Sequence, residues 1–323
     1  MSRLELQRAI LVLAASYNVA FGLWAAQVPR AFFELFGLDA PRYPAIWATL
    51  GMVIGLYGAL YAYAAWRPER ARPIVAVGLA GKIIGPIGWV VAVGSGELPV
   101  RTFGLIAFND IVWWLPFALI LADGAPVTAR LRALAPYACA AVNAAAALAL
   151  ATVLAPGASN APAEANAAYV AGHVAVWRAG WLLWIAAAIS LLAFFAWWAS
   201  RLERSVLLWS ALGIACAGLA VDLVAESLLV SWSPERYRDV APTAFRLTGI
   251  GANGLYSVAG LILAARTRRL PRWLAEWSWI VWLLGIALAA AVALGSDVGA
   301  RLLTAALFAL LVPWLVLFGR RMT

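Results

Sequence analysis

The sequence predicts an all-α fold: a polytopic transmembrane helical bundle of about ten spans. The 323 residues are 65% hydrophobic and only 12% charged, whereas a soluble globular chain carries about 25% charged residues. The mean hydropathy is +0.88. Apolar runs of roughly 20 residues recur along the whole chain, and each is long enough to cross the hydrocarbon core of a bilayer. Trp, Tyr or Arg marks both edges of most runs, as expected at the headgroup level.

The spans follow one another with short connections. Their predicted ranges are 9–27, 44–66, 74–94, 102–122, 134–154, 174–198, 206–230, 243–265, 273–294 and 299–319. The first range could instead be a signal peptide, because Arg3 and Arg8 precede it. We expect a retained helix, because the run is long and has a partner in the repeat described below.

The arginines alternate between the two sides of the predicted bundle. One side carries fifteen: Arg3, Arg8, Arg67, Arg70, Arg72, Arg130, Arg132, Arg201, Arg204, Arg266, Arg268, Arg269, Arg272, Arg320 and Arg321. The other side carries six: Arg30, Arg42, Arg101, Arg236, Arg238 and Arg301. Cytoplasmic loops are enriched in Lys and Arg. We therefore expect the larger group and both chain ends to be cytoplasmic. The abundance of alanine and arginine suggests a bacterial protein, so we expect the membrane to be a bacterial inner membrane.

Two segments on the arginine-poor side differ from ordinary short loops. Residues 31–38 are apolar but too short to span, and they predict an interfacial helix. Residues 155–171 are rich in Ala, Pro and Asn, with one charge at Glu164. We expect a flexible extracytoplasmic loop there, or a lid.

The chain shows an internal offset near 200 residues, which indicates a candidate repeat. The echoes occur in a common order: Ala40-Pro41 with Ala241-Pro242, Gly55-Leu56-Tyr57 with Gly254-Leu255-Tyr256, Val93-Gly94-Ser95 with Leu294-Gly295-Ser296, and Arg101 with Arg301. Spans 1–4 and 7–10 would then be parallel four-helix units, since six spans separate equivalent helices. The predicted division is a four-helix unit at 1–124, two linking helices at 125–203, and a second four-helix unit at 204–323.

Two glycine pairs predict close helix packing. Gly51 and Gly55, and likewise Gly81 and Gly85, are four residues apart. Each pair therefore lies on one helix face, as in tightly packed membrane helices.

Six ionisable residues fall inside the predicted spans, and their formal charges sum to zero: Lys82, Asp110, Arg178, Asp222, Glu226 and Arg246. A charge at mid-bilayer costs roughly 2.5–3.5 kcal/mol on insertion scales, so such residues usually face the bundle interior and pair. Lys82 and Asp110 each lie about 12 Å deep from opposite sides. Their levels differ by only about 6 Å in a core about 30 Å thick, so we predict an intramembrane ion pair, with Asn109 beside it.

A second polar group is expected in the outer half of the bundle. Asp222 and Glu226 are four residues apart and share one helix face. The other members of this candidate ligand-binding group, by depth or by helical spacing, are Arg178, Arg246, Asn253, His173, Trp177 and Trp181. A mostly apolar pocket with a few convergent polar groups is typical of small-molecule sites. The alternative is purely structural: charge pairs can hold a bundle together, and aromatic stripes often serve packing.

The first 124 residues carry a recognisable pattern. It consists of Phe36-Gly37-Leu38, Gly51, Gly55-x-Tyr57, Gly81-Lys82-x-x-Gly85-Pro86 and Asn109-Asp110-x-x-Trp113-Trp114-x-Pro116-Phe117. This pattern resembles a bacterial four-helix membrane domain of the DoxX type. The resemblance covers about two-fifths of the chain and implies little chemistry. It places Lys82, Asn109 and Asp110 within the recurring pattern.

Several functional classes are not expected. The arginines are spread through short loops, not gathered on one face, so the net charge of +9 does not indicate nucleic-acid binding. Cys139 and Cys216 both lie in apolar runs, where we expect small buried side chains and neither a metal site nor a disulfide. His173 is the single histidine, which argues against a bis-histidine haem.

Three functions remain open from sequence. The first is that the protein binds, or binds and transports, a small lipophilic or amphiphilic molecule. In a transporter the carboxylates would bind protons and the arginines would bind an anionic head group. The second is a membrane-embedded enzyme acting on a lipid or isoprenoid, with a carboxylate or His173 as acid–base. The third is a structural or accessory subunit of a membrane complex. No cofactor is implied, although a pigment or quinone would fit aromatic and apolar walls.

Overall fold

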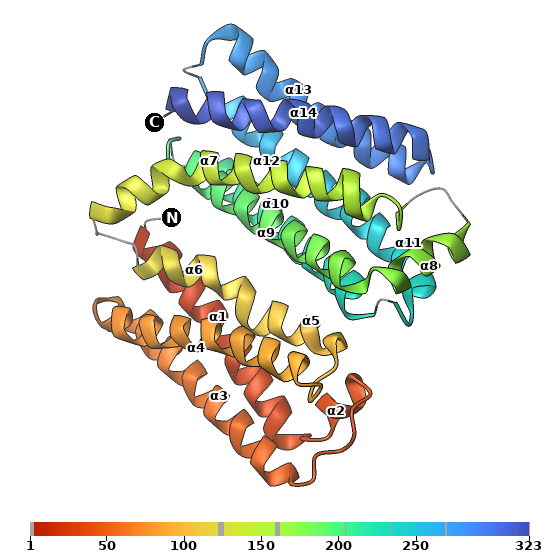
Figure 1. The fold of residues 1–323 in the computed structure, drawn as a ribbon. Coiled ribbons are helices and arrows are strands. Elements are labelled where there is room, and N and C mark those ends of the chain that lie inside the picture. Colours follow the sequence, from red (N-terminus) through yellow and green to blue (C-terminus); the bar gives the residue numbers. More distant parts are fainter. Residues whose placement is uncertain are drawn as a thin grey trace. The chain divides into compact units, whose positions relative to one another are not determined.

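The protein is all-helical over the part of the chain that the structure, a computed structural model, describes: residues 3–121, 126–158, 162–203, 205–232, 234–268 and 270–322 (Figure 1). Within these ranges ten helices are long and apolar enough to cross a membrane, which confirms the predicted fold class of a multi-pass membrane protein. Of the predicted cytoplasmic arginines, Arg204, Arg269 and the side chains of Arg3, Arg130 and Arg132 lie outside the described part. So do the predicted boundary residues 124 and 125.

The chain divides into two compact units, Met1–Ala125 and Pro126–Thr323. The second unit thus contains both the predicted linking helices and the predicted second four-helix unit. The repeat and the three-part division remain predictions. One local feature agrees with a repeat. The third and ninth spans both end in a turn with a glycine of positive φ, Gly96 (φ 78°) and Gly295 (φ 69°). In both turns the backbone N–H of the residue after the glycine donates a hydrogen bond to the carbonyl five residues earlier.

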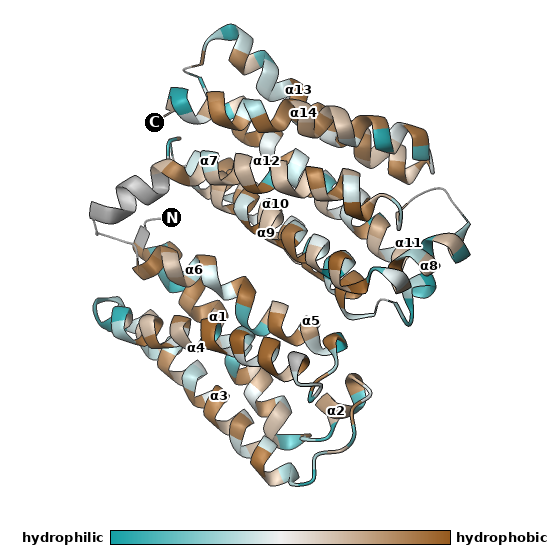
Figure 2. Cartoon of the chain, in the orientation of Figure 1, coloured by the Kyte–Doolittle hydropathy of each residue, from teal (hydrophilic) through white to brown (hydrophobic). Residues whose placement is uncertain are grey.

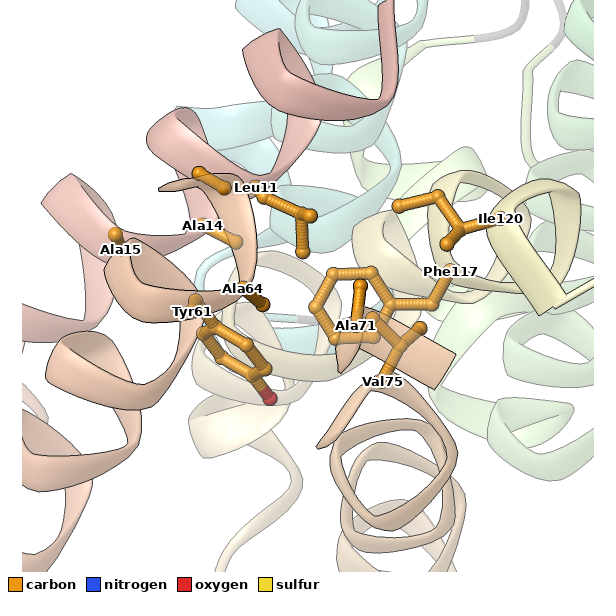
Figure 3. Close-up of a cluster of buried hydrophobic side chains, with 10 residues drawn as sticks. Leu11, Ala14, Ala15, Tyr61, Ala64, Ala71, Val75, Phe117 and Ile120 are labelled. Atoms are coloured by element: carbon orange, nitrogen blue, oxygen red, sulfur yellow. The ribbon is translucent and has the colours of Figure 1, made fainter. Parts of the chain in front are cut away.

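The first unit packs its four spans around a small core. Its helices are α1 (Arg3–Gln27), α2 (Ala31–Leu35), α3 (Pro44–Trp66), η1 (Pro68–Arg70), α4 (Ala71–Gly94), η2 (Val100–Thr102), α5 (Phe103–Ile106), η3 (Ala107–Ile111) and α6 (Val112–Leu121). Neighbours in space are α1 and α3, α3 and α4, and α4 and α6. The buried core includes Leu11, Tyr61, Val75, Phe117 and Ile120 (Figure 3). The short α2 lies within the segment 31–38 for which a helix was predicted.

Small residues let α1 and α3 approach closely. A Cβ added at Gly22 would lie 2.6 Å from the Gly51 carbonyl oxygen and 2.6 Å from the Gly55 nitrogen, far inside van der Waals contact. A Cβ at Gly55 would meet nothing within 4 Å, whereas a Cβ at Gly51 would lie 2.8 Å from the Gly22 carbonyl oxygen, so Gly51 packs as predicted. Gly81 does not, since a Cβ there would meet nothing within 4 Å, and Gly85 faces the Asp110 carboxylate instead of a helix backbone.

The second unit forms a closed ring of six helices. Its helices are α7 (Pro126–Ala149), η4 (Leu150–Leu154), α8 (Ala163–Gly172), α9 (Val174–Ala199), α10 (Val206–Ser231), α11 (Tyr237–Arg246), η5 (Leu247–Ala252), α12 (Asn253–Arg266), α13 (Arg272–Ala293) and α14 (Asp297–Met322). Contacts run from α7 to α9, α10, α12, α13, α14 and back to α7. We call these the six-helix ring. Hydrophobic residues dominate the long helices, and polar ones gather at their ends (Figure 2).

The structure corrects the expectation of a flexible loop at 155–171, while the alternative of a lid remains a prediction. Residues Ala163–Gly172 form the helix α8, which packs on α9 and α11. Alanine is the strongest helix former, and Pro162 precedes the first turn. The Tyr169 hydroxyl donates to the Val153 carbonyl at 2.8 Å, so the helix is fixed to the end of η4. Residues 159–161 of the predicted loop lie outside the described part.

Two smaller expectations also change. The eighth span begins at Tyr237, not at residue 243, because α11 buries Tyr237, Ala241 and Ala244 while its charged residues point outward. Cys139 is buried as expected, but Cys216 is exposed.

Candidate functional site

The six-helix ring encloses a cavity of about 220 Å³. All six helices of the ring contribute side chains to it. Leu191 and Trp282 lie near its inner limit, in the middle of α9 and α13, while Val292 and Ala300 lie near the turn that joins α13 to α14. The cavity therefore runs from the middle of the ring toward one end.

The walls of the cavity are mainly apolar and rich in aromatic rings. Six aromatic side chains line it: Trp181, Trp184, Phe245, Tyr256, Trp282 and Phe308. Trp181 and Trp184 face each other edge to face with their ring centroids 6.1 Å apart, and Trp184 meets Phe308 at 5.5 Å. Such contacts hold the rings in fixed orientations, so the aromatic wall is well ordered.

One carboxylate faces the cavity, that of Asp222 on α10. Its side chain is buried, and Oδ1 accepts a hydrogen bond of 2.8 Å from the Thr248 hydroxyl. Thr248 belongs to η5, a π-helical segment of the eighth span. Single π turns inside α-helices recur at functional sites, and here the segment presents both Thr248 and Gly249 to the cavity.

The remaining polar groups of the lining are neutral. Asn253 donates from Nδ2 to the Gly285 carbonyl at 2.7 Å, and Asn143 donates to the Cys139 carbonyl at 2.9 Å. Ser257 and Thr304 donate to backbone carbonyls of their own helices at 2.7 Å. These donors are already used within the protein, whereas the Tyr256 hydroxyl and the Nε1 groups of Trp181 and Trp282, which belong to lining residues, have no hydrogen-bond partner among the described residues.

The structure brings together only three of the eight residues in the predicted ligand-binding group. Asp222, Asn253 and Trp181 line the cavity. Trp177 stands behind the wall, where its ring contacts Trp181 at 5.6 Å and its Nε1 donates to the Leu229 carbonyl at 3.3 Å.

The two arginines do not join the carboxylates, contrary to the prediction. Arg178 donates from Nε to the Val230 carbonyl at 3.0 Å and does not line the cavity. Arg246 is exposed. Its neighbours Ala241 and Ala244 bury one face of α11, and residue 246 lies two positions further, about 200° around the helix from Ala244. Matching depth thus did not imply matching direction.

Glu226 is fully buried but does not line the cavity. Neither of its side-chain oxygens has a hydrogen-bond partner among the described residues. It lies one helical turn from Asp222 on the same face of α10, so the ring holds two neighbouring carboxyl groups of which one reaches the cavity.

His173 lies at the exposed junction between α8 and α9. Its ring stacks on Tyr169 with centroids 4.4 Å apart, and Nδ1 lies 2.9 Å from the Tyr169 carbonyl oxygen. An enzyme with His173 as acid–base would require this histidine beside a carboxylate in a sealed pocket. The structure instead places the His173 side chain at the surface, against Tyr169.

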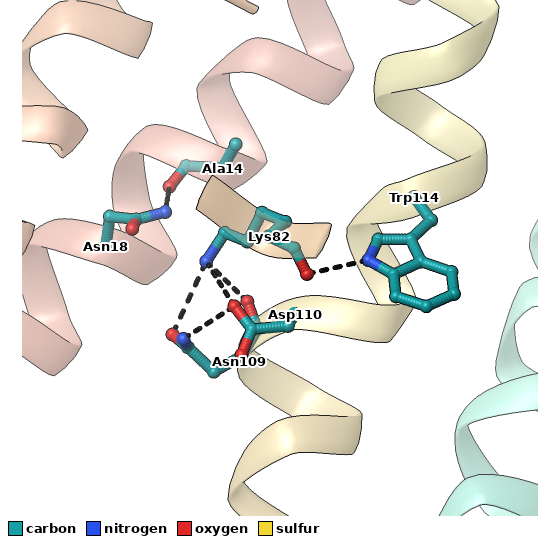
Figure 4. Close-up of polar contacts among 6 residues, drawn as sticks. All are labelled: Ala14, Asn18, Lys82, Asn109, Asp110 and Trp114. Carbon is teal, nitrogen blue, oxygen red and sulfur yellow. Dashed lines mark hydrogen bonds and ion pairs between the residues drawn. The ribbon is translucent and has the colours of Figure 1, made fainter. Parts of the chain in front are cut away.

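The first unit contains the ion pair predicted between Lys82 and Asp110 (Figure 4). Both side chains are buried, and Lys82 Nζ lies 3.7 Å from Asp110 Oδ1. Lys82 also donates to the backbone carbonyl of Asn109, which lies in the π-helical segment η3. Asn109 Nδ2 donates to Asp110 Oδ1 at 3.0 Å, and Trp114 Nε1 donates to the Lys82 carbonyl at 2.8 Å. The charged and polar groups of this network thus find their ionic and hydrogen-bond partners within the network itself.

Sequence reasoning missed several residues of the cavity. Thr248 and Asn143 carry no motif, and π-helical turns cannot be read from hydropathy. Tyr256 was noted only as part of the repeat. Comparison of the chain with known proteins gives no match to a family model, to a curated protein or to a solved structure.

Proposed function

We propose that this chain is a bacterial inner-membrane protein, with both termini cytoplasmic, that binds a small lipophilic or amphiphilic molecule in the cavity of the six-helix ring. The single observation that carries the proposal is the cavity itself: about 220 Å³, walled by six aromatic rings, with one buried carboxylate. Well-packed interiors contain few voids larger than a water molecule. A space of this size in the middle of a ring therefore requires an explanation, and a ligand provides one.

The volume limits the size of the molecule. An apolar cavity of about 150 Å³ binds benzene, and drug-sized ligands occupy about 300 Å³ or more. The present cavity accordingly suits a ligand somewhat larger than one aromatic ring. Whole lipids are too large to enter it completely.

The test fills the cavity with a side chain. Ala188 lines the cavity, whereas Ala186 on the same helix is exposed. The protein and its Ala188→Phe and Ala186→Phe variants would be purified in detergent, and small molecules that co-purify would be identified by mass spectrometry. We expect a molecule of the stated size with the parent and with Ala186→Phe, and at least a tenfold lower amount with Ala188→Phe.

Equal recovery from all three proteins would contradict the proposal, since the molecule would then lie outside the ring. If binding holds, reconstitution in vesicles decides whether the molecule also moves. Flux that Ala188→Phe abolishes and Ala186→Phe retains would extend the function from binding to transport.

A further inference from the structure

We infer that the molecule bound in the six-helix ring is a small organic cation, an amine or quaternary ammonium, whose charged nitrogen lies beside Asp222 and whose apolar body contacts the aromatic wall. This inference rests on the proposed binding function and names its ligand class.

The first argument is charge. Asp222 is the sole Asp or Glu of the cavity lining, and the lining residues include no Lys, Arg or His. Within the described part of the chain, the ion pairs involve neither Asp222 nor Glu226. Buried charges in proteins are normally paired. A cationic ligand would supply the countercharge that Lys82 supplies to Asp110 in the first unit.

The second argument is hydrogen bonding. Thr248 donates its hydroxyl hydrogen to Oδ1 of Asp222, which fixes the carboxylate within the ring. An ionised carboxylate has about four lone-pair sites, so this contact leaves acceptor positions for a ligand N–H or for the charge of a quaternary nitrogen. The Asn253 amide donates to the Gly249 and Gly285 carbonyls, and the Asn143 amide donates to the Cys139 carbonyl and the Ser190 hydroxyl.

The third argument is the aromatic wall. The faces of Trp, Tyr and Phe rings attract cations, Trp most strongly, and aromatic cages are the usual recognition device for quaternary ammonium groups. Three of the six lining rings are tryptophans: Trp181, Trp184 and Trp282. They stand in one cavity with a single carboxylate, whereas a purely lipophilic ligand would need no carboxylate.

An anionic ligand fits poorly. Asp222 faces the cavity, and the Glu226 carboxyl lies one turn away on the same helix. The arginines that could have received an anionic head group, Arg178 and Arg246, do not line the cavity. An anion would therefore lie beside the Asp222 carboxyl group with no cationic side chain in the lining.

The experiment compares three probes of one size on the full chain in nanodiscs: benzyltrimethylammonium, its uncharged isostere neopentylbenzene, and phenylacetate. Binding would be followed by quenching of tryptophan fluorescence and by thermal stabilisation. We expect the parent to bind benzyltrimethylammonium at least tenfold more tightly than either other probe. Asp222→Asn should remove this preference by weakening the cation alone at least tenfold, and the exposed control Asp297→Asn should retain it.

A second variant covers the case in which Asp222→Asn does not fold. Trp184→Leu keeps an apolar wall but removes one cation-binding ring face, and a cation–π contact is worth about 0.5–2 kcal/mol. This corresponds to about a twofold to thirtyfold weaker cation binding, with neopentylbenzene little changed. Equal effects on both probes would count against the inference.

The outcomes separate the two proposals. Tight binding of neopentylbenzene with no preference for the cation would overturn the inference but leave the cavity as a binding site. Preference for phenylacetate would do the same. No binding of any probe, together with equal recovery of co-purified molecules from Ala188→Phe and Ala186→Phe, would remove both.

Discussion

At the scale of single residues, the two units satisfy their buried carboxylates differently. Asp110 has a lysine at 3.7 Å and an amide donor at 3.0 Å from the same chain. Asp222 receives a hydroxyl hydrogen from Thr248 at 2.8 Å and faces a cavity. A charged group needs such partners once it leaves water. The first arrangement is complete within the protein and is best understood as structural, whereas the second leaves a place for a ligand.

Gly85 makes room for the Asp110 carboxylate, which provides a test of the structural network. A Cβ at residue 85 would lie 3.0 Å from Asp110 Oδ2, and the carboxylate is held by Lys82 and Asn109. We expect Gly85→Ala to lower the free energy of unfolding by about 1–3 kcal/mol, the usual cost of overpacking. Thermal and denaturant unfolding of the purified protein would measure it.

The control lies one turn earlier on the same helix. A Cβ at Gly81 would meet nothing within 4 Å, so Gly81→Ala should be neutral or should stabilise the protein by up to about 1 kcal/mol through helix propensity. If the two alanine variants unfolded alike, Gly85 would not be the residue that accommodates Asp110.

At the scale of elements, π-helical segments carry some of the buried polar side chains of both units. The segment η3 contains Asn109 and Asp110, and η5 contains Thr248. In a third segment, η4, Leu150 lines the cavity and the Val153 carbonyl accepts the hydrogen bond from Tyr169. A π turn leaves carbonyls without their usual helical partner, so side chains can reach them. Accordingly, side chains donate hydrogen bonds to backbone carbonyls within η3 and η4: Lys82 to Asn109, and Tyr169 to Val153.

The helix α8 yields a prediction at this scale, because its sequence suggested a loop. Amide hydrogen exchange should show protection across Ala163–Gly172. Tyr169→Phe removes the hydrogen bond to Val153, and a hydrogen bond contributes about 1 kcal/mol. We expect exchange in α8 to become about fivefold faster in this variant.

Glu164→Gln serves as the comparison. It removes an exposed ion pair with Arg238 of 3.5 Å, and exposed pairs contribute little, so exchange in α8 should change by less than twofold. Exchange of the parent at the rate of an unstructured peptide would show that α8 is not a stable helix.

At the scale of the whole molecule, the number of spans and the distribution of arginines predict the topology. The described part of the chain has ten candidate spans, which is an even number. We therefore predict that both chain ends lie on one side of the membrane and, from the positive-inside rule, that this side is the cytoplasm. The ring cavity, which runs toward the α13–α14 turn, would then extend toward the extracytoplasmic side.

Reporter fusions test this topology. Alkaline phosphatase is active only outside the cytoplasm, so we expect a fusion ending at Ser296, in the α13–α14 turn, to be active. A fusion at the C-terminus should be inactive, and a fluorescent-protein fusion there should be bright. The reversed pattern would invert the assigned orientation.

The sequence alone determined the span number, the approximate positions of the long helices and one buried pair. Apolar length, aromatic edges and arginine alternation are properties of a linear chain in a bilayer, so they can be counted without a structure. Lys82 and Asp110 could be paired from depth because they lie on consecutive spans, and a lysine side chain bridges a small difference in level.

Only the tertiary structure decided which residues face the cavity. Depth placed Arg178 and Arg246 level with Glu226, one turn from Asp222, but the rotation of each helix about its axis is set by packing against its neighbours. Packing turned Arg246 outward and Asp222 inward, and the π turn of η5 brought Thr248 to the carboxylate. Side-chain direction in a ring of six helices depends on contacts between segments far apart in the chain, which no local pattern contains.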